Sequence, residues 1–156
     1  MNFAVVESWV EAPLRRFVDD ARVLLALILH PSGQVLAQSG FTRAVDVMSA
    51  CALAAGIHAS AGELGKMLDG KPFGGLHHAG RERQIYLAPA STKRATYIVL
   101  AVFDEASSLG LVQLYFRELS QSLAAAAPAP VEEKPVLATN FEGELNRNLA
   151  VLFGRA

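Results

Sequence analysis

The feature that most constrains this chain is residues 97–103, YIVLAVF, an unbroken apolar run that ends at Asp104 and Glu105. β-Branched and aromatic side chains dominate residues 94–103, a composition typical of a strand. A strand that is apolar on both faces has to be covered on both faces. We therefore expect a central strand over residues 94–103, in a sheet with helices on both sides.

Helical periodicity predicts three helices around this strand. Apolar residues recur at helical spacing over residues 7–22, 47–68 and 107–126, which indicates amphipathic or buried helices. In the first of them Pro13 fits only a first turn, so we expect the regular helix to begin near Ala12.

The other strands are marked by aliphatic runs and turn residues. Residues 24–30 and 35–40 are joined by Pro-Ser-Gly-Gln, which favours a β-hairpin. One or two short strands fall within residues 76–90, and a turn at residues 91–93 leads into the central strand. The order is helix, two strands, helix, three strands, helix. It predicts an α/β three-layer sandwich with about five antiparallel strands.

The predicted helix at residues 47–68 contains two kinds of apolar residue. The large ones form a stripe suited to packing on a sheet, and the small ones form a largely separate stripe. Glycine costs roughly 1 kcal/mol relative to alanine inside a helix, so the glycines here call for a neighbour that approaches closely, from the same chain or from a second one. The large residues are Leu53, Ile57, Leu64 and Leu68; the small ones are Ala52, Ala55, Gly56, Ala59 and Gly62.

Composition divides the chain into three parts. Residues 1–125 form the predicted domain, residues 126–138 an Ala/Pro-rich linker, and residues 139–156 a tail with one short amphipathic helix. A lone helix of this length is marginal in water, so its apolar stripe has to dock on another surface. That stripe consists of Phe141, Leu145, Leu149 and either Leu152 or Phe153.

Charge and cysteine content narrow the functional classes. With 52% hydrophobic and 19% charged residues, the chain is too apolar for intrinsic disorder. A net charge of −1 gives no electrostatic case for nucleic acid or an anionic membrane. The single Cys51 permits no internal disulfide and fits a reducing compartment. The N-terminus lacks a signal-peptide pattern and the apolar runs are too short for a bilayer, so we expect a cytoplasmic protein without membrane insertion.

No motif points to catalysis, to a metal or to a cofactor. The adjacent His77 and His78 point to opposite faces of a strand, and no HxxxH or CxxC spacing occurs. The sequence has neither a G-x-S-x-G elbow nor a P-loop. We therefore expect a protein that is not an enzyme, with no cofactor, no metal and no catalytic residue.

The polar stretch after the central strand allows a reactive site or a structural boundary. Ser107 or Ser108 can accept hydrogen bonds from free N–H groups at a helix start. Asp104 and Glu105 lie near the positive end of the helix dipole, where a negative charge is stabilised by roughly 0.3–1 kcal/mol. We interpret the stretch as a helix cap.

Three segments resemble the roadblock/dynein-light-chain family. Residues 25–40, LALILHPSGQVLAQSG, are similar to its first hairpin, although His30 stands where the family often carries Asp. Residues 53–68, LAAGIHASAGELGKML, and 99–114, VLAVFDEASSLGLVQL, resemble in particular the bacterial MglB type within that family. The resemblance covers roughly residues 5–125, and its most specific part is the FDxxxSLGxV stretch.

The resemblance implies a homodimer that pairs edge strands and central helices across a two-fold axis. It implies a regulator that activates a small Ras-like (MglA-like) GTPase without an arginine finger, with a tail that promotes nucleotide exchange. The setting is bacterial cell polarity or gliding motility, with a cell pole as a site of concentration. Glu63 departs from the pattern, because such sequences tend to keep a small residue there. The implied GTPase-binding residues are Ala52, Ala55, Gly56, Ala59, Gly62, Glu63, Lys66, Phe141, Leu145, Leu149 and Phe153.

Two other functions stay open at this point. A roadblock scaffold or adaptor would bind a GTPase or polarity protein equally in its GDP and GTP states, without changing nucleotide turnover. A small-molecule sensor or enzyme would carry a tightly bound ligand.

Overall fold

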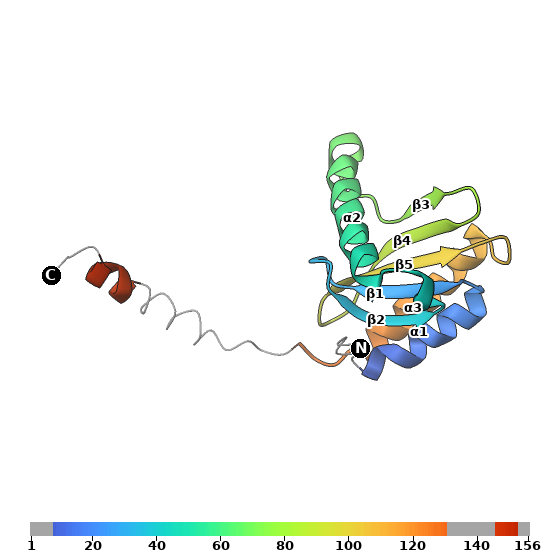
Figure 1. Ribbon diagram of the computed structural model, residues 1–156, viewed down its shortest axis with the longest axis horizontal. Helices are drawn as coiled ribbons and strands as arrows, with labels where there is room; N and C mark the ends of the chain where they lie inside the picture. Colours follow the sequence, from blue (N-terminus) through green and yellow to red (C-terminus); the bar gives the residue numbers. More distant parts are fainter. Residues whose placement is uncertain (1–7, 131–145, 153–156) are drawn as a thin grey trace.

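The computed structural model describes residues 8–130 and 146–152. The predicted order of helices and strands is confirmed (Figure 1). A short 3-10 turn, η1, precedes the central helix, and residues 146–152 are also helical. In chain order the elements are α1 (Ser8–Ala21), β1 (Leu25–Leu29), β2 (Val35–Gly40), η1 (Thr42–Ala44), α2 (Val47–Asp69), β3 (Leu76–Ala79), β4 (Gln84–Ser91), β5 (Thr96–Phe103) and α3 (Leu109–Ala126).

The five strands form one antiparallel sheet in the order β2-β1-β5-β4-β3. The apolar strand β5 lies at its centre, as predicted, with β1 on one side and β4 on the other. Leu100 of β5 stands opposite Leu27 of β1 and Leu87 of β4. The outer edges belong to β2 and to the short β3.

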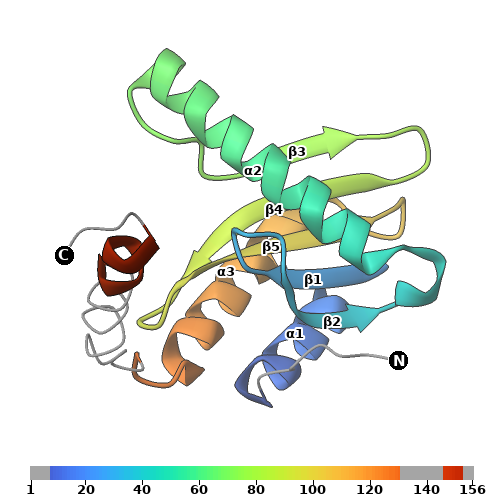
Figure 2. The same cartoon turned by 60° about the vertical axis from the view of Figure 1, so that its left-hand side comes forward.

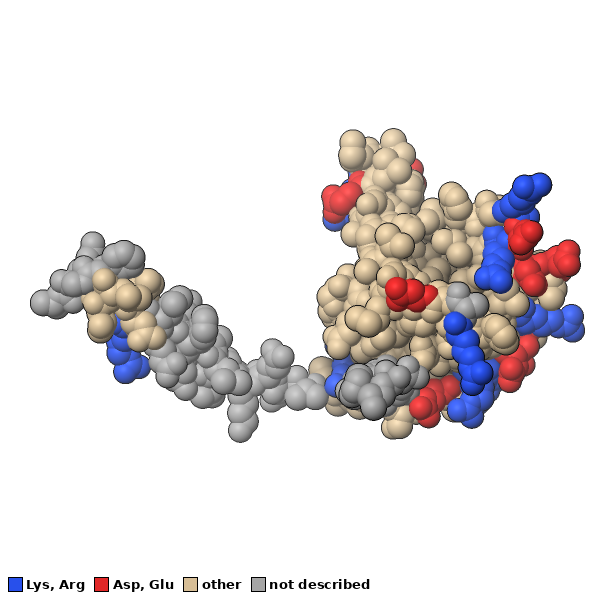
Figure 3. All heavy atoms as spheres, viewed as in Figure 1, with Lys and Arg blue, Asp and Glu red and all other residues tan. Residues whose placement is uncertain are grey.

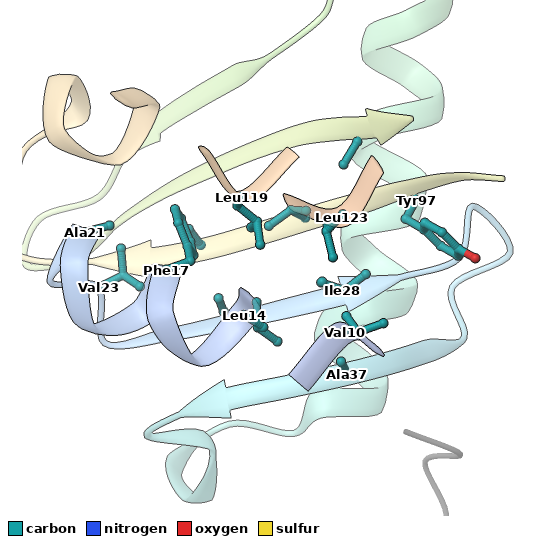
Figure 4. Packing of buried hydrophobic residues seen from close by; sticks show 14 of the residues in the cluster. Val10, Leu14, Phe17, Ala21, Val23, Ile28, Ala37, Tyr97, Leu119 and Leu123 are labelled. Atoms are coloured by element: carbon teal, nitrogen blue, oxygen red, sulfur yellow. The ribbon is translucent and has the colours of Figure 1, made fainter. Parts of the chain in front are cut away.

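Helices cover both faces of the sheet, which confirms the three-layer α/β architecture (Figure 2). Alternate residues of β5 divide between two cores, because successive side chains of a strand point to opposite faces. Val99 and Phe103 lie in the core shared with α1 and α3, whereas Ile98 and Leu100 lie in the core under α2. Figure 4 shows Leu14 and Phe17 of α1 reaching the same layer as Leu119 and Leu123 of α3.

Helix α1 begins earlier than predicted. It starts at Ser8 and continues through Pro13, so the expected beginning near Ala12 is wrong. Proline inside a helix removes one backbone hydrogen bond. The turn before it is held by packing instead: Val10 is only 2% exposed, and the Trp9 ring lies 6.0 Å from the Tyr97 ring, centroid to centroid.

The polar stretch after β5 caps α3, as interpreted from the sequence. Ser108 is the N-cap residue, and its Oγ accepts a hydrogen bond from the backbone N–H of Leu111 at 3.2 Å. The carboxylate of Asp104 accepts from the backbone N–H of Ala106 at 2.9 Å. The Ser107 hydroxyl donates to the backbone carbonyl of Ala21 and so ties the start of α3 to the end of α1.

Candidate protein interface on helix α2

Helix α2 runs for 23 residues, and both of its ends are capped. At the N-terminus the carboxylate of Asp46 accepts hydrogen bonds from the hydroxyl and the backbone N–H of Ser49, at 2.7 and 3.2 Å. These bonds favour the ionised carboxylate and hold the pKa of Asp46 below its usual value. At the C-terminus Gly70 takes the left-handed conformation, with φ 74°, and its N–H donates to the carbonyl of Lys66.

The side of α2 that faces the sheet is lined with small residues, not with large ones. Cys51, Ala54, Ala55 and Gly65 are its buried positions. The expectation that the large stripe packs on the sheet is therefore wrong. The reason is the hairpin between β1 and β2, which packs against this part of the helix: a Cβ atom on Gly33 would lie 3.3 Å from the Cα atom of Ala52 and 3.8 Å from the Cβ atom of Ala55, so a larger side chain at Ala55 would meet the hairpin.

Gly65 marks a second close approach, to the loop that follows α2. A Cβ atom at this position would lie 2.4 Å from the backbone N of Phe73 and 2.7 Å from the carbonyl O of Lys71. Backbone atoms cannot rotate away as a side chain can. Glycine is therefore required at Gly65 for the loop to pass against the helix.

The large side chains of α2 form an uncovered apolar surface, which we call the large face. The distal part of the helix extends beyond the sheet (Figures 1 and 2), and charged side chains gather mainly elsewhere on the side seen in Figure 3. Contiguous exposed apolar surface of this kind marks interaction sites. The large face consists of Leu53, Ile57, Leu64 and Leu68, which are 69%, 39%, 49% and 69% exposed, with Met67 at 82%.

Length and composition alone would let α2 cross a membrane. Its most apolar 18-residue window has a mean hydropathy of 1.2, and 17% of that window is buried. The buried side of the helix is nevertheless packed on the sheet, and Glu63 and Lys66 lie within the helix. We therefore treat α2 as a layer of the domain. One side of the helix packs on the sheet, and the large face and one further side remain available to other proteins.

A third side of α2, the small-residue face, brings together most of the helix residues predicted to bind a partner. Ala52, Gly56, Ala59, Glu63 and Lys66 follow one another at intervals of three or four residues and are exposed, which is the spacing of one helical face. Gly62 is half-buried, and Ala55 is 8% exposed against the sheet. Ala55 is thus the predicted helix residue that a partner reaches least.

Gly56 differs from Gly65 in having no neighbour in the described part of the chain. A Cβ atom at Gly56 would meet no heavy atom within 4 Å. Packing within the domain therefore gives no reason for the glycine, which costs about 1 kcal/mol relative to alanine. This is the position where a second molecule can approach the α2 backbone most closely.

The tail is described only in part. At residues 146–152 Leu149 is 40% exposed, and its neighbours Val151 and Leu152 are 82% and 77% exposed. The predicted docking role of Leu149 stays a prediction. The other predicted tail residues, Phe141, Leu145 and Phe153, lie outside the described residues.

Two other residues considered for chemistry, His77 and Cys51, take part in packing and in a local polar contact. A ring nitrogen of His77 lies 2.7 Å from the side-chain oxygen of Gln84, and the ring stacks on Phe103 at 6.1 Å. Burial raises the pKa of the Cys51 thiol to about 11, which makes it a poor nucleophile. Within residues 8–130 and 146–152, no three His, Cys, Asp or Glu side chains gather as a metal site would require.

Comparison with known proteins identifies the fold. Neither a protein-family model nor a curated protein sequence matches the chain. MglB of Myxococcus xanthus is 26% identical and has a TM-score of 0.69, over 76% of this chain and 94% of that one. An MglB with a tetrameric arrangement is 22% identical, with a TM-score of 0.68, over 80% of this chain and 93% of that one. A Roadblock/LC7 domain from Streptomyces avermitilis is 16% identical, with a TM-score of 0.61, over 76% and 94%. The chain therefore has a roadblock-type fold that resembles MglB, as its sequence segments indicated.

Proposed function

We propose that this chain is a homodimeric regulator of a small Ras-like GTPase, which accelerates GTP hydrolysis and promotes nucleotide exchange through its tail. The likeness to MglB supports a roadblock-like regulator. The observation that carries the proposal is that α2 has two uncovered faces of different chemistry. One face suits a second copy of the chain, and the other suits a partner that needs close contact with the helix backbone.

The large face is the proposed dimer surface. Homodimer interfaces are more apolar than the rest of a protein surface. In a two-fold dimer the same patch meets itself, so exposed residues such as Leu53 and Leu64 on one helix can cover those of the other. The edge strand β3 ends the sheet on one side, which leaves its outer backbone groups available for pairing with a second copy. The tetrameric MglB among the similar structures is consistent with self-association.

The small-residue face is the proposed GTPase surface. The absence of side-chain bulk at Gly56 and Ala59 lets another backbone approach closely. Helix α2 contains no arginine, so contacts from this face cannot insert a guanidinium into the GTPase site. We infer that the regulator acts by positioning the GTPase's own residues and is not itself the catalyst.

One substitution tests the assignment of the GTPase surface. Ala59→Arg places a long side chain on the small-residue face, and it should abolish binding and stimulation of phosphate release by steric intrusion. Gln121→Arg, on the exposed side of α3, is the matched control and should behave as the unaltered protein. If A59R stimulates GTP hydrolysis by the GTPase as much as Q121R does, the GTPase surface is misassigned.

A scaffold function is the second candidate, and Glu63 favours it. Glu63 stands where MglB-like sequences tend to keep a small residue, so the resemblance supports binding of a GTPase more than activation of its hydrolysis. A scaffold would bind the GDP and GTP forms of the GTPase with equal affinity, without changing hydrolysis or exchange. Measuring both affinities and both rates decides between the two functions.

The tail has its own test. Deleting residues 139–156 should leave a folded dimer whose GTPase affinity or exchange activity is altered, because the tail supplies a second docking segment. Loss of folding would mean that the tail belongs to the core of the domain. In the cell we place the protein in the cytoplasm, concentrated at a pole together with its GTPase, which a fluorescent fusion would test.

A further inference from the structure

The carboxylate and ammonium groups of helix α2 before its last residue lie close together. Between Val47 and Leu68 its only Asp, Glu, Lys or Arg side chains are Glu63 and Lys66, and its one histidine is His58. Lys66 Nζ and Glu63 Oε1 lie 3.0 Å apart, and the two side chains remain 54% and 73% exposed. The helix is therefore apolar or small-polar except at this pair and at His58.

The pair extends the small-residue face. Ala52, Gly56, Ala59, Glu63 and Lys66 are separated alternately by four and three residues, which keeps them on one side of the helix. A molecule that lies along Gly56 and Ala59 therefore also reaches the charges. Such a molecule covers the backbone at Gly56, which no side chain shields, and the Glu63–Lys66 ion pair farther along the helix.

Folding does not require this ion pair. An exposed pair three residues apart on a helix contributes little to stability, and both side chains of this pair are more than half exposed. Each charge keeps hydrogen-bonding capacity, because a carboxylate has about four acceptor sites and an ammonium three donors. Covering the pair without counter-groups would leave that capacity unmet.

We propose that Glu63 and Lys66 select the partner of this face: the docking surface presents a basic group opposite Glu63 and an acidic group opposite Lys66. This rests on the proposed function, in which the partner is a small Ras-like GTPase. A GTPase with the opposite arrangement would meet like charges, and that repulsion discriminates more sharply than lost attraction does. The small residues permit contact with many surfaces, and the pair restricts which of them bind.

A charge exchange isolates this effect. The double variant E63K/K66E keeps composition, net charge and an opposite-charge pair on the helix, but it reverses the order of the charges. The probe is the organism's own Ras-like GTPase loaded with a non-hydrolysable GTP analogue, titrated at low and high salt. We expect E63K/K66E to raise the Kd for the GTPase about tenfold or more, and a tenfold rise corresponds to about 1.4 kcal/mol of binding free energy.

Two further variants make the test specific. E63Q/K66Q removes both charges and should weaken the salt dependence of binding, because salt screens charge pairs between molecules. R15D/D19R exchanges two exposed charges on α1, in the other helical layer, and should leave Kd within about twofold of the unaltered protein.

The possible outcomes distinguish failure of this inference from failure of the proposed function. If the unaltered chain binds the GTPase and E63K/K66E binds within about twofold of it, the selection role is wrong and the proposed function stands. If E63Q/K66Q binds more tightly than the unaltered chain, the pair is only an obstacle and the inference also fails. If E63K/K66E separates the dimer in sedimentation, the pair faces the second copy and not the GTPase. If the unaltered chain does not bind the GTPase, the proposed function and this inference fail together.

Discussion

The two glycines Gly56 and Gly65 offer a matched test of how α2 is held. Each is replaced by alanine, so the same methyl group is added at two positions of one helix. At Gly65 the new Cβ atom would lie 2.4, 2.7 and 2.9 Å from backbone atoms of Phe73, Lys71 and Pro72. At Gly56 it would meet no heavy atom within 4 Å in the described chain.

The expected magnitudes follow from these contacts. Adding a methyl group to a closely packed site costs about 1–3 kcal/mol, and alanine returns about 1 kcal/mol of helix propensity. Because all three contacts at Gly65 are to backbone, we take the upper end of the cost. Gly65→Ala should therefore lower the free energy of unfolding by about 2 kcal/mol. Gly56→Ala should raise it by about 1 kcal/mol.

The assay is urea unfolding followed by circular dichroism, with both variants at one protein concentration. A fixed concentration is needed because the unfolding of a dimer depends on it. Sedimentation of each variant confirms that its oligomeric state is unchanged. Equal free energies of unfolding for the two variants would refute the reasoning, because they would mean that the loop after α2 does not press on Gly65.

Three more outcomes follow from other contacts. Leu53→Glu should weaken the proposed dimer at least about tenfold in sedimentation equilibrium, whereas Leu114→Glu, which alters a 50% exposed leucine on α3, should not. Burial raises the pKa of Cys51 to about 11, so the neutral thiol stabilises the fold below the unfolded-state pKa. That contribution should be lost as pH rises from about 9 toward 11, in the unaltered protein and not in Cys51→Ala. Ser108→Ala should lower the free energy of unfolding by about 1 kcal/mol, because it removes the α3 cap.

The order of elements could be predicted because each carries its own periodicity. Residues 97–103 are apolar on both faces, and the structure places them in the central strand with a separate core on each side. The cap at Ser108 could be predicted for a similar reason, since strand, polar turn and helix follow within a few residues. Local patterns were sufficient wherever local contacts decide the outcome.

The orientation of α2 could not be predicted in the same way. Periodicity separates its large and small stripes, but it does not say which stripe meets the sheet. Large residues are the usual choice for burial, and the prediction failed because the hairpin at Gly33 packs against Ala52 and Ala55, where a larger side chain at Ala55 would meet it. That distance is set by residues far apart in the sequence. Ala55 was misplaced for the same reason, because it sits at the boundary between the small-residue face and the sheet.

The pairing of β1 with β5 has a consequence for synthesis of the chain. Leu25 stands opposite Val102, so the first strand to leave the ribosome waits for the last before the sheet can close. At about 5–20 residues per second this interval lasts several seconds. In the later part of this interval the large face of α2 has already been made, because Leu68 precedes Thr96 in the chain, while the sheet that anchors the helix is still incomplete. The nascent chain therefore passes through a stage in which chaperone binding competes with folding, and slow translation ahead of β5 would prolong it.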